Sequence, residues 1–188
     1  MKQIAYVTGN SLKFNVAKKA LENSDIELIQ EKLETPEIQS ENGEEVAAFS
    51  AKWASEKLGK PVIVSDFGVY IEALNGFPGP FIKYINHWLT SEDIIRLMNG
   101  KENRKITERD YLAYCEPGTE PVVFVGENFG NITTKLGQIK YRGYTLDQIF
   151  IPDGFDRVQS EIPEEQMIEF WNSGKVWEKL TQYLISIK

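Results

Sequence analysis

The alternation of apolar runs and polar breaks predicts strands and helices in turn over the first third of the chain. The apolar run from Ile4 to Thr8 predicts a buried strand, which Gly9 and Asn10 end. Apolar residues then recur at helical spacing from Leu12 to Leu21, and the run from Leu28 to Leu33 predicts a second strand. The polar stretch that follows contains a proline and is typical of a loop.

A helix is predicted after Gly43, and its apolar face is expected to carry Val46, Phe49 and Trp53. A glycine and a proline near position 60 end this helix. The apolar run from Pro61 to Val64 then predicts a central strand, which places Asp66 just beyond its carboxyl end.

The rest of the chain is expected to hold short strands, tight turns and a helical C-terminal region. A short strand over Val69 to Ala73 precedes the turn "NGFPGP", and a helix over Ser91 to Met98 is capped by Thr90 or Ser91. Further strands are expected at Tyr111 to Cys115, Val122 to Val125 and Asn131 to Thr134, and helices from Glu164 to Ile187 with a break near Asn172 to Gly174. We therefore expect residues 1–188 to form one α/β domain with a mixed sheet.

Charge and composition narrow the class of protein. The 188 residues carry 28 acidic and 21 Lys or Arg side chains, which gives a net charge of −7 and disfavours nucleic-acid polymers and anionic membranes as partners. A single cysteine, Cys115, excludes an internal disulfide and is expected to be a small buried hydrophobe. No apolar run approaches the roughly 18 residues that span a membrane, so we expect a soluble, cytoplasmic protein.

The segment "TGNSLK" lies where the first strand gives way to a helix N-terminus. Thr8 and Asn10 stand beside the free N–H groups of that helix, and Lys13 lies one turn inside, so the segment favours an anion such as a phosphate. An N-capped helix with a solvated lysine is the alternative. Neither "GxxxxGK" nor "GxGxxG" is present, so this is not a Walker or dinucleotide-binding motif.

Two acids that are far apart in the sequence are candidates for a metal site. Asp66 follows a strand, and ligands of α/β proteins bind at strand carboxyl ends, whereas Glu37 lies in the loop before Gly43. Mg²⁺ commonly takes one or two carboxylates together with waters and substrate phosphates, so these two acids suffice if the fold brings them together. A solvated loop glutamate is the alternative for Glu37.

The "DFG" that contains Asp66 also invites a kinase interpretation. A protein kinase needs a Gly-rich loop and an H-R-D catalytic loop upstream of D-F-G. The one histidine, His87, lies downstream, so the kinase interpretation fails. His87 is expected to be an exposed or capping residue, and the lack of a second histidine also disfavours Ser/His and Cys/His triads.

Five segments, taken in order, resemble the inosine triphosphate pyrophosphatase family, also called the Ham1 family: "YVTGNSLK", "ETPEIQ", "VIVSDFG", "EALNGFPGPFIKY" and "DQIFIPDG". The resemblance covers nearly the whole chain. It implies an α/β fold with a long mixed central sheet, helices on both sides and two lobes flanking a cleft, and it implies a homodimer. It further implies Mg²⁺-dependent hydrolysis of non-standard purine nucleoside triphosphates such as ITP, dITP and XTP. In that reaction water attacks the α-phosphorus, and a monophosphate and pyrophosphate are released.

The same resemblance implies roles for individual residues. Thr8, Asn10 and Lys13 would cradle phosphates, Glu37 and Asp66 would bind Mg²⁺, Asp66 would also orient the water, and Lys83 would neutralise developing charge. On the base side, Tyr144 would stack on the purine and Asp147 would accept a hydrogen bond. An ordinary half-buried loop aromatic is the alternative for Tyr144.

The chain also departs from the family pattern. Ser65 replaces an acid beside Asp66, which removes a negative charge from the metal site, and Phe67 replaces a small residue. The family's S-H-R segment, which reads the six-keto purine, is replaced by Trp171, Asn172 and Ser173. A bidentate arginine and an imidazole are therefore missing there.

These matches and departures leave three hypotheses. The first is a nucleoside triphosphate pyrophosphatase that keeps the phosphate and metal residues. The second is a protein that keeps the family fold, has weak or no catalysis, and acts as a nucleotide-binding or structural protein. The third is a hydrolase with altered base specificity.

Overall fold

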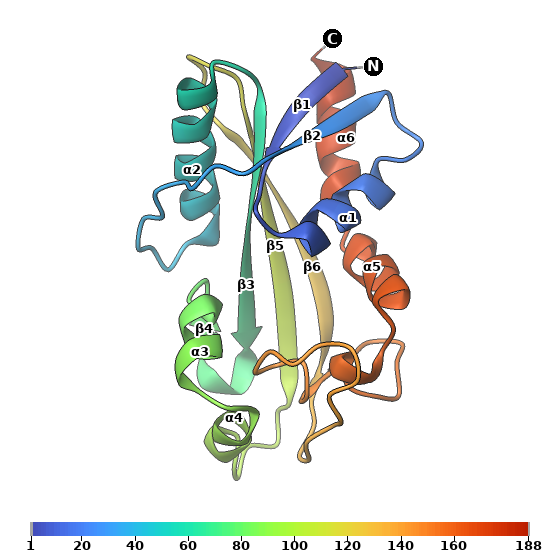
Figure 1. Ribbon diagram of the computed structural model, residues 1–188. Coiled ribbons are helices and arrows are strands. Elements are labelled where there is room, and N and C mark those ends of the chain that lie inside the picture. Colours follow the sequence, from blue (N-terminus) through green and yellow to red (C-terminus); the bar gives the residue numbers. More distant parts are fainter. Residues whose placement is uncertain (1, 188) are drawn as a thin grey trace. The chain divides into compact units, whose positions relative to one another are not determined.

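The computed structural model describes residues 2–187, which form a mixed α/β fold (Figure 1). Within these residues the sheet has seven strands in the order β2-β1-β3-β5-β6-β7, and β4 pairs with β3 off that path. The strands are β1 (Lys2–Val7), β2 (Ile26–Glu31), β3 (Val62–Ile71), β4 (Pro78–Gly79), β5 (Lys105–Cys115), β6 (Val122–Ile132) and β7 (Phe150–Pro152). The helices are α1 (Ser11–Ala20), α2 (Gly43–Leu58), α3 (Ile82–Trp88), α4 (Ser91–Leu97), α5 (Glu164–Ser173) and α6 (Val176–Ser186), with short 3₁₀ turns at Glu72–Leu74 and Gln159–Glu161. The expected α/β class with a mixed sheet is confirmed.

The chain divides into two compact units. The first unit comprises Met1–Asp66, Asp110–Gly126 and Gly174–Lys188, and the second comprises Phe67–Arg109 and Glu127–Ser173. The predicted helix break near Asn172 to Gly174 is confirmed, and it coincides with a boundary between the units.

The first unit is built around β1, which pairs in parallel with β2 and with β3. Helix α2 lies on one side of these strands and α1 and α6 on the other (Figure 1). Tyr6 of β1 is almost completely buried, and its ring meets the edge of the Trp177 ring of α6 at a centroid distance of 5.4 Å. The apolar core of this unit consists mainly of Ile4, Tyr6, Ala17, Ile63, Leu112, Val176, Trp177 and Leu180.

The apolar face predicted for α2 is partly wrong. Val46 is buried as expected, but Phe49 is 43% exposed, and small residues occupy the buried stripe instead. These are Ala47, Ser50, Ala51 and Ala54. Small side chains on that stripe let the helix approach its neighbours closely, so Phe49 is not among the residues that face the core.

The prediction that a strand ends at Val64 and another begins at Val69 is also wrong, because β3 is continuous from Val62 to Ile71. Its pairing with β1 ends where Val7 lies opposite Val64, and its pairing with β4 begins at Val69. Asp66 therefore lies within a strand. It lies two residues after Val64, the last β3 residue that pairs with β1, and the apolar pattern of the sequence ends at that point.

A third correction concerns Asn131, which was expected to begin a hairpin partner but belongs to β6. In this strand the buried positions of the second half are Gly126, Asn128, Gly130 and Ile132, and the alternating positions are exposed. Glycine and asparagine at buried positions hide the two-residue period from a search for apolar side chains.

The second unit has a separate apolar core, which includes Val69, Ile71, Ile94, Ile106, Ile149, Phe150, Ile162 and Met167. Helix α4 starts at Ser91, and Thr90 caps it as predicted. Thr90 Oγ1 accepts a hydrogen bond from Asp93 N while the Asp93 carboxylate accepts one from Thr90 N. Cys115 of the first unit is buried and His87 is exposed, as expected. Among residues 2–187, no helix is long and apolar enough to cross a membrane.

Candidate active site

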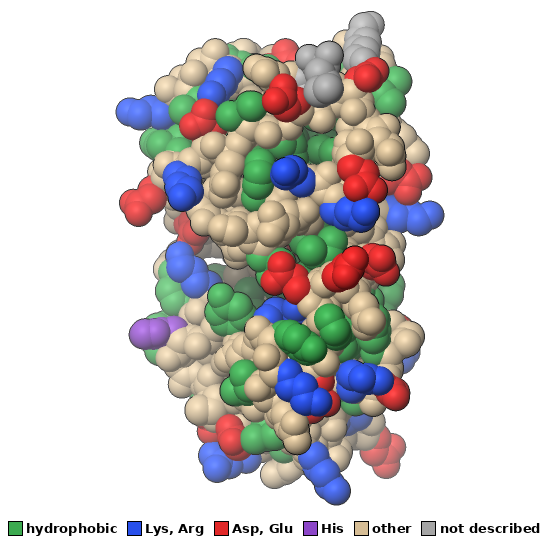
Figure 2. Space-filling view, turned by 45° about the vertical axis from the view of Figure 1, so that its right-hand side comes forward, with side chains coloured by type: hydrophobic (Ala, Val, Ile, Leu, Met, Phe, Trp, Pro, Cys, Tyr) green, Lys and Arg blue, Asp and Glu red, His purple; other side chains and the backbone are tan. Residues whose placement is uncertain are grey.

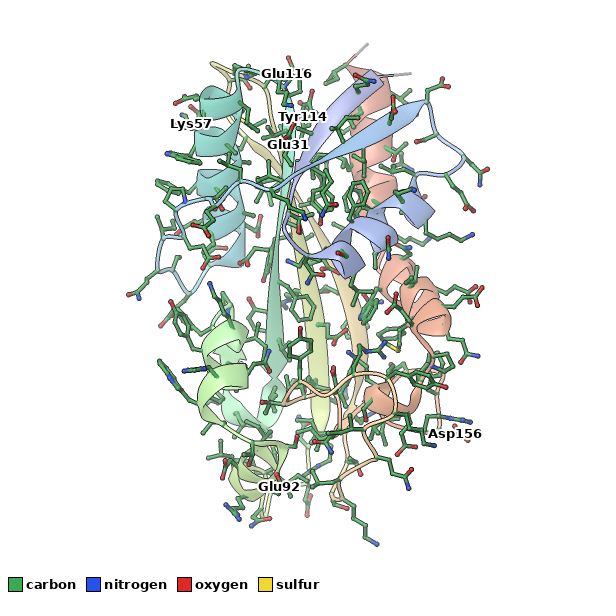
Figure 3. All side chains as sticks on the ribbon, viewed as in Figure 1. Glu31, Lys57, Glu92, Tyr114, Glu116 and Asp156 are labelled. Carbon is green, nitrogen blue, oxygen red and sulfur yellow. The ribbon has the colours of Figure 1, made fainter. Side chains whose placement is uncertain are left out.

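The turn between β1 and α1 is held by the side chains that the sequence singled out. Asn10 caps α1, because its Oδ1 accepts hydrogen bonds from Leu12 N (2.9 Å) and Lys13 N (3.3 Å). Thr8 Oγ1 accepts from Asn10 N at 3.1 Å, and Thr8 N donates to the carbonyl of Glu31 (3.0 Å), which is labelled in Figure 3. The capped-helix interpretation is therefore correct for Asn10, and the phosphate-binding role of the turn stays a prediction.

Lys13 lies in the first turn of α1 and reaches the strand that carries Asp66. Its Nζ donates to the carbonyl oxygen of Ser65 at 3.4 Å, and the Ser65 hydroxyl is 2.7 Å from the Tyr6 hydroxyl. The first turn of α1 contains no acidic residue, so no side chain of that turn offsets the positive end of the helix dipole. An ammonium and a helix N-terminus thus gather positive charge at this end of β1.

Asp66 and Asp110 form an acidic pair beside that positive charge. They lie on β3 and β5, which are neighbours in the sheet. The pKa of Asp110 is raised to about 6, mainly by burial; the negative charge of Asp66 raises it further, and the Lys13 ammonium acts in the opposite direction. Lys13, Asp66 and Asp110 are therefore within electrostatic reach of one another in the first unit.

Asp110 was not predicted, because the strand that carries it was expected to begin one residue later, at Tyr111. The structure starts β5 at Lys105 and buries Thr107, Glu108 and the run from Tyr111 onward. A charged residue directly preceding a fully buried strand segment was the available signal.

The donor set fits a hard divalent cation. Asp66 and Asp110 supply two carboxylates, which is the number that Mg²⁺ commonly takes from protein when phosphate oxygens and water complete its octahedron. No group of three or more His, Cys, Asp or Glu side chains is placed to hold a metal within the described part of the chain. Glu37 lies exposed between β2 and α2, next to Pro36, whose carbonyl accepts a hydrogen bond from Ser50 Oγ at 3.4 Å. Its role as a metal ligand stays a prediction.

The predicted residues of the second unit lie in two places. Lys83 is exposed on α3, and Tyr144 is 63% exposed in the segment before β7. Asp147 is only 5% exposed. Its Oδ2 accepts from Tyr144 N (3.0 Å) and its Oδ1 from Gln159 Nε2 (2.9 Å). Burial raises the pKa of Asp147, and these hydrogen bonds and the nearby Arg142 lower it. Asp147 therefore fixes the loop that presents Tyr144.

Arg142 and Trp171 form a stacked pair next to this loop. The Arg142 guanidinium carbon lies 5.1 Å from the centre of the Trp171 ring, and the indole nitrogen donates to Glu108 Oε2 at 3.2 Å. Arg142 Nη2 donates to the carbonyl of Gln159 at 2.6 Å. Burial lowers the pKa of Arg142. Neither Arg142 nor Gln159 was predicted; a basic residue in the aromatic stretch "YRGY" was the available signal.

Comparison with known proteins gives a consistent picture. The model of the Ham1 family matches residues 4–183. A dITP/XTP pyrophosphatase of Methanopyrus kandleri is 40% identical over 182 residues, which cover 96% of this chain and 95% of the relative. A dITP/XTP pyrophosphatase of Thermococcus kodakarensis is 34% identical and covers 97% of both chains.

The fold is also shared with solved structures. A HAM1 protein from Coxiella burnetii superposes with a TM-score of 0.82 at 22% identity and covers 99% of this chain and 100% of its own. The Staphylococcus aureus Ham1 protein gives a TM-score of 0.80 at 24% identity and covers 100% of both chains.

Proposed function

The chain belongs to the Ham1 family, and from this premise we propose that it is a nucleoside triphosphate pyrophosphatase that acts on non-standard purine nucleotides such as dITP, XTP and ITP. The observation that carries the proposal is the grouping of Lys13, Asp66 and Asp110 beside the N-terminus of α1. An ammonium, a helix N-terminus and two carboxylates are the groups that metal-assisted phosphoryl chemistry requires.

Mg²⁺ is the proposed cofactor, and Asp66 and Asp110 would hold it, with Glu37 as a predicted further ligand. Once bound, the ion would offset negative charge on the polyphosphate and on the departing pyrophosphate. A divalent cation held by the two carboxylates would also relieve their mutual repulsion.

The residues of the first unit have distinct proposed roles in the reaction. Lys13 and the N–H groups at the start of α1 would bind phosphate oxygens, and Asn10 and Thr8 would keep those N–H groups in place. A water oxygen would form a bond to the α-phosphorus while the bond from that phosphorus to the bridging oxygen breaks. The Asp66 carboxylate would orient the water and accept its proton, and pyrophosphate would leave.

The presence of Asp110 favours an active pyrophosphatase over the alternative hypothesis of a family-fold protein with weak or no catalysis. Ser65 stands where the resemblance implies an acid, and its hydroxyl is paired with Tyr6. The position therefore contributes no charge. Asp110 supplies a second negative charge to Asp66 from the neighbouring strand, so a pair of carboxylates remains.

The second unit carries the proposed base-side residues. Tyr144 presents an exposed ring that suits stacking on a purine, and the Asp147 carboxylate holds the backbone of that loop. Lys83 would neutralise developing charge. The cytoplasmic location and the homodimer are also parts of the proposal, and they rest on the resemblance and on the acidic, cysteine-poor composition.

A panel of nucleoside triphosphates tests the function. With Mg²⁺, pyrophosphate release from ITP, dITP and XTP should exceed release from ATP and GTP, and chelation of the metal should abolish it. Asp66→Asn and Lys13→Ala should each lower kcat/KM by at least about a hundredfold. Asp66→Asn removes a negative charge that would hold the metal, and Lys13→Ala removes a positive charge that would contact the phosphate. Lys19→Ala is the matched control, since Lys19 lies on the same helix and pairs with exposed Glu22. Turnover of none of the triphosphates would overturn the proposal.

A further inference from the structure

Arg142 keeps two hydrogen-bond donors buried and unused. Its Nη2 donates to the carbonyl oxygens of Gln159 (2.6 Å) and Ile162 (3.4 Å). Its Nε and Nη1 are shielded from solvent and have no hydrogen-bond partner among residues 2–187. Buried donors of a charged group are rarely left unpaired, so these two need an explanation.

Gln159 leaves an acceptor unused in the same place. Gln159 is buried, with 6% of the residue exposed. Its Nε2 donates to Asp147 Oδ1 at 2.9 Å. That bond to a carboxylate fixes which end of the amide is nitrogen. Gln159 Oε1 is buried and, like the two Arg142 donors, has no hydrogen-bond partner in the described chain.

Negative charge and an aromatic face surround the guanidinium. Asp147, Glu164 and Glu108 all act on Arg142 through space, and the Trp171 ring lies 5.1 Å below it. Glu108 in turn accepts a hydrogen bond from Trp171. The cation is therefore held in position by several groups, although its own fork is only partly used.

The unused groups match one edge of a six-keto purine. Hypoxanthine and xanthine present the O6 and N7 acceptors beside an N1–H donor, whereas adenine presents an N6 amino donor beside an N1 acceptor. An arginine N–H donates to O6, one of the acceptors by which arginine reads guanine, and an amide oxygen accepts from N1–H. An adenine base would place its amino group against the Arg142 donors.

We propose that Arg142 and Gln159 are base-recognition residues that select a six-keto purine: Arg142 Nη1 donates to O6, and Gln159 Oε1 accepts from N1–H. This inference rests on the proposed function and names the residues that choose its substrate. Both groups are closed to solvent, so the base reaches them when the segment around Arg142 moves outward. That segment carries exposed Tyr141 and Tyr144 on either side of Arg142.

Kinetics on ITP and ATP test the inference directly. Arg142→Ala should lower kcat/KM for ITP by about ten- to a hundredfold and leave kcat/KM for ATP nearly unchanged, so that the preference for ITP falls by the same factor. Arg142→Lys keeps the charge but not the fixed N–H directions of the planar guanidinium, and it should restore thermal stability without restoring the preference.

Arg157→Ala is the matched control. It removes an equal charge from the same unit, and the exposed Arg157 side chain pairs with its neighbour Asp156 at 2.9 Å. Figure 3 shows Asp156 at the outer edge of the molecule. If Arg142 merely braces its loop, then kcat/KM for ITP and ATP would fall together with the Tm in Arg142→Ala, and Arg142→Lys would restore all three. That result would overturn the inference.

Product binding separates this inference from the proposed function. Titration calorimetry with IMP and AMP, without metal, should show tighter binding of IMP to the wild-type protein and a loss of that preference in Arg142→Ala. A preference that survives Arg142→Ala overturns the inference even where ITP is hydrolysed. If no triphosphate is hydrolysed but the IMP preference depends on Arg142, then the proposed function fails and the base-recognition inference stands.

Discussion

At the residue scale, only some of the polar and charged residues of the candidate site could be predicted from the sequence. Lys13 and Asp66 stood out because each breaks an apolar pattern next to a strand end, and the structure brings both to the same part of the first unit. Asp110, Arg142 and Gln159 did not stand out. Their importance comes from burial and from partners on other strands and loops, which a linear pattern does not encode.

The raised pKa of Asp110 predicts how stability depends on pH. The carboxyl titrates near 4 in the unfolded chain and at about 6 in the folded protein, so the folded state holds a proton that the unfolded state has lost between these values. The contribution of Asp110 is therefore most favourable below pH 4, and it declines by about 3 kcal/mol as the pH rises from 4 to 6.

Asp110→Asn removes this titration. In the presence of a chelator, the variant should be more stable than the wild-type protein at pH 8 and should lose the part of the pH dependence that falls between pH 4 and 6. Urea unfolding at several pH values measures this difference. Unchanged pH dependence in the variant would show that Asp110 titrates at an ordinary value in the folded protein.

Tyr144 tests stacking at the base side. Tyr144→Ala should raise KM for ITP about tenfold with a smaller change in kcat, because stacking binds the ground state and the transition state alike. Tyr141→Ala is the matched control, since Tyr141 is 57% exposed on the same segment. Steady-state kinetics measures KM and kcat of both variants. An equal rise of KM in both would show that the loop as a whole is disturbed, which would contradict a specific stacking role of Tyr144.

At the element scale, helix starts with a capping side chain were easier to predict than strand boundaries, whereas α3, which has no side-chain cap, was missed. The N-cap of α1 and the capping box of α4 have local chemical signatures, so their positions were correct to within a residue. The ends of β3 and β6 depend on which neighbouring strand continues to pair, and this information lies elsewhere in the chain. In β6 the buried positions carry glycine because of close packing, so the apolar alternation is absent from the sequence.

Gly130 of β6 provides a test of that packing. A Cβ at this position would lie 2.3 Å from the carbonyl oxygen of Ile151, which belongs to β7 on the paired strand. Gly130→Ala should therefore destabilise the protein by about 1 to 3 kcal/mol, since backbone has to shift to admit the methyl group. Gly9→Ala is the control, because nothing lies within 4 Å of its Cβ position. Thermal unfolding of the two variants should separate them, and equal Tm values would contradict the packing argument.

At the scale of the whole molecule, charge sets which anions the protein accepts. The net charge of −7 repels polyanions at long range. On the face shown in Figure 2, acidic and basic side chains are interspersed, without a continuous basic band. The positive groups of the candidate site are local, namely Lys13 and the start of α1. We propose that such a site holds one polyphosphate together with its cation and offers little to a long chain of phosphates.

This balance predicts discrimination between a mononucleotide and a nucleic-acid polymer. Retention of a polymer requires many phosphate contacts, and each contact adds close to one unit to the slope of log K against log salt. We expect no retention on immobilised single-stranded DNA even at low ionic strength, while a nucleoside triphosphate with Mg²⁺ still raises the Tm of the same preparation. Polymer binding that weakens steeply with salt would reveal a basic surface elsewhere on the protein. If the nucleoside triphosphate with Mg²⁺ also fails to raise the Tm, then the proposed phosphate site at Lys13 is contradicted, because one triphosphate needs only the local contacts of that site.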